Sequence, residues 1–250
     1  MELNLNGRWA LVTGGSKGIG LACAKALAAE GCNLHLAART AADLEKARDD
    51  IAAGYNVAVN TYATDLSETD GRAGLVKDVG DLDILINNAG AIPGGNITDL
   101  SDDVWRQAWE LKVFGYIDMA RMIFPVMCKK GTGVIINVAG IAGKLAMPDY
   151  VAGATGNAAL INFSRSLGVA GAGQGVRVVC INPGPTLTDR LMYLRRLTAE
   201  KEFGDPERHG ELPANSRLGR PAEPEEVADL VVFFASERAS FMTGSVIDME

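Results

Sequence analysis

Short apolar runs alternate with longer segments of helical spacing along the whole chain. Several of the short runs are apolar at almost every position, which is typical of parallel strands buried on both faces. They predict strands at Ala10–Thr13, Asn33–Ala37, Val57–Ala63, Ile84–Asn87, Val134–Val138 and Val176–Ile181. The segments between them predict helices at Ile19–Glu30, Thr40–Ala52, Glu68–Val79, Ser101–Lys129, Tyr150–Gly171 and Pro224–Ser236. This alternation predicts one doubly wound α/β domain over residues 1–250, with a mainly parallel sheet and helices on both faces.

One segment departs from this alternation. Residues 186–221 are polar and charged, and they are rich in Arg, Gly and Pro. Long connections of this kind are often functional. We therefore expect an insertion within the single domain that acts as a mobile lid over a substrate site.

The composition narrows the classes of function. Hydrophobic residues fill 48% of the 250 positions, which is enough for a core and excludes a disordered chain. The net charge of −7 argues against a nucleic-acid partner, because such binding needs a basic face. Cys23, Cys32, Cys128 and Cys180 are scattered singly, so we expect free thiols and no metal site. Residues 1–9 are polar and mixed and no apolar run is long enough to span a membrane, so we expect a cytoplasmic protein without membrane contact.

The segment Thr13–Gly20 stands between a predicted strand and an Ala-rich predicted helix. A strand that turns sharply into a helix can present free backbone N–H groups to a pyrophosphate. A Cβ would block this close approach, which explains glycine at Gly14, Gly18 and Gly20. The alternative is a plain tight turn, and the order of strand, loop and helix favours a dinucleotide site.

The end of the second predicted strand bears on the choice of cofactor. Chains that bind NAD commonly place an acid there to accept from the ribose 2′-OH, whereas this chain has Ala38 and then Arg39. Arg39 can hold a 2′-phosphate through charge-assisted hydrogen bonds, and Lys17 adds a second cation nearby. The alternative is that both are solvated surface cations. We expect NADP as the preferred cofactor, with NAD as a possible second one.

Further motifs follow in order along the chain, and together they resemble the classical short-chain dehydrogenase/reductase family from about Leu5 to Ile247. The matching segments are Thr13–Gly20, Asp65-Leu66, Asn87–Gly90, Asn182–Gly184, Thr186 and Thr188. The resemblance implies an oxidoreductase on a Rossmann-type fold with about seven strands, which acts on a small molecule and forms a homodimer or homotetramer. The predicted cofactor-binding set is Gly14, Ser16, Lys17, Gly18, Ile19, Gly20, Arg39, Asp65, Leu66, Asn88, Ala89, Gly90, Lys112, Pro183, Gly184, Thr186 and Thr188.

The resemblance fails at the positions where the family keeps its proton-transfer residues. The family's Asn, Ser, Tyr and Lys align with Lys112, Gly140, Gly153 and Asn157. Transfer of a hydride to or from a carbonyl carbon requires a proton to move at the oxygen. In the family a Tyr phenol moves that proton, a Lys lowers the pKa of the phenol, and a Ser polarises the carbonyl. Glycine can do none of this.

Two features keep catalysis open and give the candidate catalytic set Lys112, Tyr150 and Asn157. Lys112 and Asn157 look exchanged relative to the family, so Lys112 could place an ammonium near the usual site. Tyr150 lies three residues before Gly153, about one helical turn, and its ring could fold into the volume that the glycine vacates. The alternatives are that Tyr150 caps a loop and that Lys112 is an interface or surface cation.

Three hypotheses of function follow. The first is an NADP-dependent oxidoreductase for a small-molecule alcohol or carbonyl, with an atypical proton relay. The second is a catalytically silent NADP(H)-binding sensor or partner subunit, which would bind cofactor without turning it over. The third is an enzyme of another reaction class, since the fold alone does not fix the reaction.

Overall fold

The computed structural model describes residues 2–250, and its centre is one sheet of seven parallel strands. The spatial order is β3-β2-β1-β4-β5-β6-β7. The strands are β1 (Trp9–Thr13), β2 (Asn33–Ala38), β3 (Val59–Ala63), β4 (Ile84–Asn87), β5 (Gly133–Val138), β6 (Val176–Pro183) and β7 (Ser245–Met249). The prediction of a doubly wound parallel sheet with about seven strands is confirmed. From β1 the strands follow one another outward to β3, and from β4 they follow one another in the opposite direction to β7. The switch point between β1 and β4 is where open α/β sheets of this kind bind ligands.

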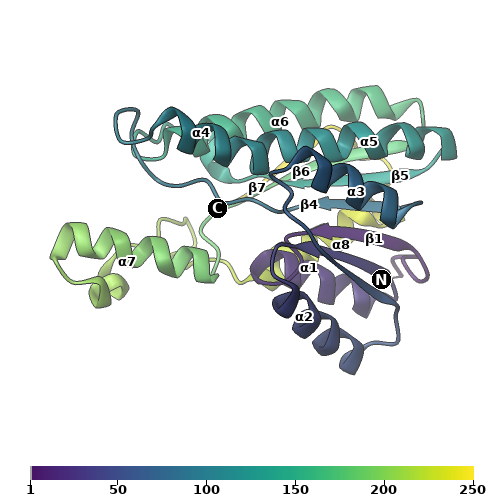
Figure 1. Cartoon of the computed structure of the whole chain (residues 1–250), viewed down its shortest axis with the longest axis horizontal. Helices are drawn as coiled ribbons and strands as arrows, with labels where there is room; N and C mark the ends of the chain where they lie inside the picture. The colour runs from purple at the N-terminus through teal and green to yellow at the C-terminus, as the bar shows by residue number, and fades with distance from the viewer. Residues whose placement is uncertain (1) are drawn as a thin grey trace.

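Helices cover both faces of the sheet (Figure 1). The helices α1 (Gly18–Ala29), α2 (Ala41–Gly54) and α8 (Pro224–Ala235) pack on one face, and α3 (Thr69–Val79), α5 (Gly115–Lys130) and α6 (Val151–Ala172) pack on the other. Each face has its own apolar core. Leu34, Leu36 and Ile86 point to the first core, while Leu11, Leu85 and Ile135 point to the second. Burial of alternate side chains on opposite faces explains why the central strands are apolar throughout.

The long helix predicted over Ser101–Lys129 is interrupted by a wider turn. The chain forms α4 (Asp102–Trp109), a π-helical segment at Glu110–Phe114, and then α5. Ser101 caps α4 as its sequence suggests, because its side chain accepts from the Val104 amide. The π-helical segment places the candidate residue Lys112 inside the protein, and such segments are frequent at functional sites.

The segment 186–221 contains more regular structure than its composition indicates. Thr188 caps α7 (Asp189–Phe203), and a 3₁₀ turn follows at Pro206–Glu211. Figure 1 shows α7 projecting beyond the layered body, near the C-terminus. The segment returns to the body through α8, which begins with Pro224 and a capping box between Glu223 and Glu226.

Candidate active site

One threonine, Thr13, connects the carboxyl ends of β1 and β4 through hydrogen bonds. The Thr13 hydroxyl accepts from the backbone amides of Asn88 (2.9 Å) and Ala89 (3.1 Å). The Asn88 side chain donates to the Thr13 carbonyl at 3.1 Å and to the Gly14 carbonyl at 3.4 Å. These contacts bring two predicted segments, Thr13–Gly20 and Asn87–Gly90, to the same edge of the sheet.

The glycine loop between β1 and α1 has the form of a phosphate cradle. Gly14 and Gly18 adopt φ values of +67° and +55°, which favour glycine. A Cβ on Gly20 would lie 2.1 Å from the Gly14 carbonyl oxygen, so only glycine fits there. The first turn of α1 has no side-chain cap and no acidic residue, so its backbone N–H groups stay available to an anion. These features fit the pyrophosphate of a dinucleotide.

Other predicted residues lie around this cradle. Ser16 and Ile19 are half-buried beside it, and Lys17 is exposed at the start of α1. Thr188, from the start of the 186–221 segment, lies against the loop, because a Cβ on Gly18 would stand 3.3 Å from the Thr188 methyl. The loop is therefore faced by a part of the chain distant in sequence.

The ends of β2 and β3 place one cation near one carboxylate. Arg39 follows β2 and is exposed, and Asp65 follows β3. The Asp65 carboxylate accepts from the Ser67 amide at 2.9 Å and from the Ser67 hydroxyl at 2.7 Å. These hydrogen bonds lower the pKa of Asp65, and the charge of Arg39 adds to the effect. Asp65 is thus a fixed carboxylate beside the predicted phosphate-binding Arg39.

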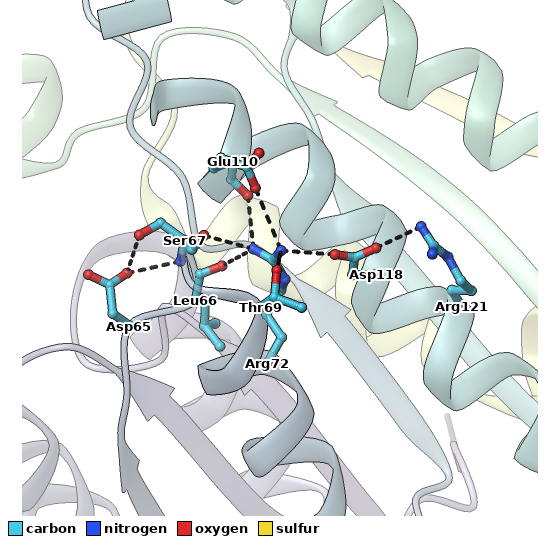
Figure 2. A network of polar contacts seen from close by, with 8 residues as sticks. All are labelled: Asp65, Leu66, Ser67, Thr69, Arg72, Glu110, Asp118 and Arg121. Carbon is cyan, nitrogen blue, oxygen red and sulfur yellow. Dashed lines mark hydrogen bonds and ion pairs between the residues drawn. The ribbon is translucent and has the colours of Figure 1, made fainter. Parts of the chain in front are cut away.

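A buried arginine, not foreseen as a site residue, holds the segment that carries Asp65 and Leu66 (Figure 2). The Arg72 guanidinium donates to the carbonyls of Leu66 (2.9 Å) and Ser67 (3.0 Å), and to the Glu110 carbonyl at 3.3 Å. It also pairs with the Asp118 carboxylate at 2.9 Å. Arg72 is only 1% exposed. It therefore ties the loop after β3 to the π-helical segment and to α5.

Arg72 had a recognisable signal in the sequence. It stands three residues before Leu75 and seven before Val79, and both of these side chains are buried. A charged residue on the apolar stripe of a helix indicates a buried, paired charge.

Lys112 points into the protein from the π-helical segment. Its ammonium donates to the Val138 carbonyl at 2.8 Å, to the Tyr116 hydroxyl at 3.0 Å and to the Ala139 carbonyl at 3.3 Å. Tyr116 in turn donates to the Val138 carbonyl at 3.0 Å. Of the alternatives for Lys112, a surface cation is excluded, because this side chain is buried at the end of β5.

The burial of Lys112 changes the pKa of its ammonium. This burial also needs the space that a neighbouring glycine leaves free. Burial lowers the pKa of Lys112 from 10.5 to about 8. The hydrocarbon part of the side chain lies on Gly90, where a Cβ would stand 2.3 Å from the Lys112 Cδ. Gly90, the last residue of the Asn87–Gly90 segment, thus makes room for the lysine rather than only for a cofactor.

Asn157 lies next to the same end of β5. Its side-chain amide donates to the Gly153 carbonyl at 2.9 Å, and a Cβ on Gly140 would stand 3.4 Å from that amide nitrogen. Its side-chain oxygen is buried without a hydrogen-bond partner. Among residues 2–250, no hydrogen bond joins Asn157 directly to Lys112; they approach β5 from α6 and from the π-helical segment.

Tyr150 occupies the volume that Gly153 leaves open. A Cβ on Gly153 would stand 2.0 Å from the Tyr150 Cζ, so no other side chain fits at Gly153 while the ring is there. The ring packs against a small apolar cluster that contains Ile92 and Ala152. Tyr150 is the N-cap of α6, with a non-helical backbone, and its ring lies over the glycine three residues later in the chain.

The remaining predicted residues lie where β6 leads into the 186–221 segment. Pro183 ends β6 and is buried, and the Gly184 amide donates to the Met249 carbonyl at 2.7 Å. The Thr186 hydroxyl donates to the Gly184 carbonyl at 3.1 Å. These contacts fix the base of the segment against β7, so α7 starts from a defined point.

With this geometry in view, the family can be assigned. A family model described as short chain dehydrogenase matches residues 8–198. The chain belongs to this family.

Individual proteins extend the comparison to the full length of the chain. An uncharacterized oxidoreductase of Bacillus subtilis (strain 168), YvrD, is 31% identical over 258 residues, covering 100% of this chain and 97% of that protein. Galactitol 2-dehydrogenase (L-tagatose-forming) of Cereibacter sphaeroides is 29% identical over 248 residues, covering 98% and 94%. The crystal structure of L-sorbose reductase from Gluconobacter frateurii, complexed with NADPH and L-sorbose, has a TM-score of 0.93 and 33% identity, covering 100% and 97%.

Other kinds of site receive no support from the described part of the chain. Residues 2–250 contain no group of three or more His, Cys, Asp or Glu side chains that could hold a metal ion. All four cysteines are free thiols. No helix in that range combines the length and apolar character needed to cross a membrane.

Proposed function

We propose that this protein is an NADP-preferring oxidoreductase that interconverts a secondary alcohol and a ketone in a polyol or sugar. The placement of the Tyr150 phenol in the volume left by Gly153 carries the proposal, because it returns a proton-transfer group to a chain that lacks one at the aligned position. Two similar proteins, an L-sorbose reductase and a galactitol 2-dehydrogenase, support the substrate class.

The described residues fit a dinucleotide. The glycine loop and the N-terminus of α1 would hold the pyrophosphate, and Arg39 with Lys17 would hold a 2′-phosphate. Asp65 and Leu66 would contact the adenine, and Asn88 to Gly90 would back the cofactor. Thr186 and Thr188 would meet its nicotinamide end. Bound NADP(H) would supply or accept the hydride.

The proton relay we propose is atypical. Glycines stand where the family has its Ser and Tyr, and Asn157 stands where it has Lys. We assign proton transfer at the substrate oxygen to the Tyr150 hydroxyl. We assign to Asn157 a neutral hydrogen bond at the active-site edge, and its unpartnered buried oxygen supports this role.

In this proposal Lys112 acts from inside the protein, and not from a solvent-exposed position. Its ammonium is buried against the carbonyls of Val138 and Ala139, which lead directly into Gly140. Lys112 would therefore keep a positive charge behind the site and hold the end of β5 next to Asn157. The exchange of Lys112 and Asn157 relative to the family is explained if the two act as one unit.

We also propose that residues 186–221 form the lid over the substrate and that the protein is a homo-oligomer. Apolar side chains exposed on α4, the π-helical segment and α5 support the second point; they include Val104, Phe114 and Val126. Light scattering at micromolar protein should give a mass above one chain, and a monomeric mass would refute this part.

The decisive test of function is cofactor turnover. Purified protein with NADPH is tested on a panel of ketoses, and with NADP⁺ on the corresponding polyols. We expect turnover with part of the panel, and this turnover should be slow, because the general acid–base catalysis at stake in the missing residues typically contributes about 10²–10⁴ in rate. Tight NADPH binding without turnover on any of the panel would favour the sensor instead.

The proposed unit of Lys112 and Asn157 is tested by a double-mutant cycle. Lys112→Asn and Asn157→Lys are each expected to weaken NADPH binding, and the double variant should bind more tightly than either single variant. Additive losses in the double variant would show that the two residues act independently.

A further inference from the structure

One cation of the 186–221 segment reaches back to the body of the protein. Arg190 lies in the first turn of α7, one residue after Asp189, where the helix begins. Its guanidinium donates to the Ile92 carbonyl at 2.8 Å, in the loop that follows β4. This hydrogen bond joins the proposed lid to residues that are 98 positions earlier in the chain.

Ile92 belongs to the small apolar cluster on which the Tyr150 ring packs. The backbone strengthens this arrangement, because the amide of Val151 donates to the Gly95 carbonyl at 3.4 Å in the same loop. The loop after β4 is thus in contact with Arg190 on one side and with Tyr150 on the other. Arg190 and Tyr150 therefore have this loop as a common neighbour; burial raises the pKa of the phenol, and the positive charge of Arg190 lowers it.

The other charged groups around Tyr150 are exposed or engaged elsewhere. On the loop after β4, on α4, directly before α6 and in the first turn of α7, the exposed ones are Asp99, Asp102, Asp103, Arg106, Asp149 and Asp189. On the π-helical segment, Glu110 pairs with Arg72 and the Lys112 ammonium is bonded to β5. Arg190 is therefore the cation placed to act on the phenol.

We propose that Arg190 is a positioning residue of the reaction, and that its guanidinium stabilises the ionised form of Tyr150 when α7 is docked on Ile92. The inference rests on the proposed role of Tyr150 in proton transfer. In this proposal the cation that acts on the phenol is Arg190 from the proposed lid, whereas the family uses a lysine for this purpose. The proton relay would then be complete only with the lid in this position.

The proposed step is a single proton transfer. In the oxidation direction, the O–H bond of the substrate breaks and an O–H bond forms on the Tyr150 phenolate, so the negative charge passes from the phenol oxygen to the substrate oxygen. In the reduction direction, the Tyr150 hydroxyl returns the proton. A guanidinium near the phenol favours the phenolate through opposite charge.

Two opposing effects act on the phenol. Burial raises the pKa of Tyr150, and the charge of Arg190 lowers it, with burial the larger effect. Removal of the charge would leave burial unopposed and raise the pKa of Tyr150 further. This change can be measured whether or not the protein turns over a substrate.

The test compares Arg190→Gln and Arg190→Lys with Arg196→Gln as a matched control. Arg196 is on the same helix and exposed, and its nearest acidic partner is Glu207 at 3.9 Å. Ionisation of Tyr150 is followed by the ultraviolet absorbance of phenolate during a pH titration. From each protein the matching one that also carries Tyr150→Phe is subtracted, because the Arg190 guanidinium also lies over the Tyr193 ring, 5.8 Å from its centroid. We expect the Arg190→Gln variant to titrate at higher pH than the wild type, and the Arg190→Lys and Arg196→Gln variants to titrate close to it. An unchanged titration in Arg190→Gln would overturn the proposal.

The pH profile of turnover supplies a second readout. In alcohol oxidation, the acidic limb for Arg190→Gln should move to higher pH, and Arg190→Lys should restore it. A higher KM with an unmoved profile would show instead that Arg190 binds the substrate, and would contradict the proposal.

The two proposals fail in different ways. If Tyr150→Phe abolishes turnover but Arg190→Gln leaves the phenol titration unchanged, only the role of Arg190 is refuted. If Tyr150→Phe keeps full turnover while the titration shifts, the charge contact stands and the proposed proton relay is refuted.

Discussion

The buried lysine makes a quantitative prediction about stability. The pKa of Lys112 is about 8 in the folded protein, against 10.5 for an ordinary lysine. Between these pH values the unfolded chain still holds a proton that the folded protein has released. Stability therefore rises with pH across this window, because the unfolded state binds more protons. Each pKa unit is worth about 1.4 kcal/mol, so the rise attributable to Lys112 is about 3 kcal/mol.

Replacement by methionine removes this titration and keeps a similar shape. Denaturant unfolding of the wild type and of Lys112→Met is measured from pH 7 to above 10.5. Tyrosine and cysteine titrations remote from Lys112 are common to both proteins and cancel in the difference, whereas the charge of Lys112 lowers the pKa of Cys180 and this coupling is lost in the variant. The stability of the wild type minus that of the variant should rise by about 3 kcal/mol between pH 8 and 10.5.

Lys130→Met provides a control of opposite sign. Burial lowers the pKa of Lys130, but its bonds to Asp83 and Asp81 raise it, and the net change is upward. Its stabilising contribution should therefore persist through the window and decline only at higher pH. If the stability of the wild type minus that of Lys112→Met does not change with pH, the burial of the lysine charge is refuted. The contacts described at the end of β5 would then be refuted as well.

Three further substitutions test other parts of the site. Arg39→Ala should weaken NADP binding by about 1.5–3 kcal/mol, typical of a lost charged hydrogen bond, and leave NAD binding nearly unchanged by calorimetry. Gly153→Ala should expel the Tyr150 ring, lower stability by about 1–3 kcal/mol and abolish turnover, whereas retained turnover would place the phenol elsewhere. Arg72→Met should lower stability by about 3 kcal/mol, at the lower end for a broken buried ion pair because Asp118 keeps some solvent contact; an unchanged unfolding midpoint would contradict this.

Local rules were enough to predict much of the fold. The continuous apolar strands and the glycine loop follow from burial on two faces and from the steric demands of a tight turn, and both were predicted from the sequence. The position of the Tyr150 ring was also anticipated from its spacing to Gly153, although Tyr150 stands at the N-cap of α6 and not within the helix. Strand β7 was not located in the sequence, since Ser245–Met249 is only half-buried and mixes polar with apolar residues.

The inward turn of Lys112 depends on contacts that are distant in sequence. The π-helical segment is held by Arg72 from α3, and the lysine side chain needs the space over Gly90. No periodicity within residues 101–129 reports either contact, so the sequence predicted a regular helix there. Arg190 lies on α7, within the segment 186–221. Its bond to Ile92 depends on how that helix docks.

The central claim is that Tyr150 performs the proton transfer that the aligned Gly153 cannot. Tyr150→Phe tests it most directly, because the ring and its packing remain while the hydroxyl is lost. Single-turnover oxidation of a polyol that the wild type accepts is followed by NADPH absorbance, and NADPH affinity is measured on the same preparations. We expect unchanged affinity and a rate reduced by about 10²–10⁴, as for loss of a general acid–base. A Tyr150→Phe protein that turns over at the wild-type rate would contradict the claim.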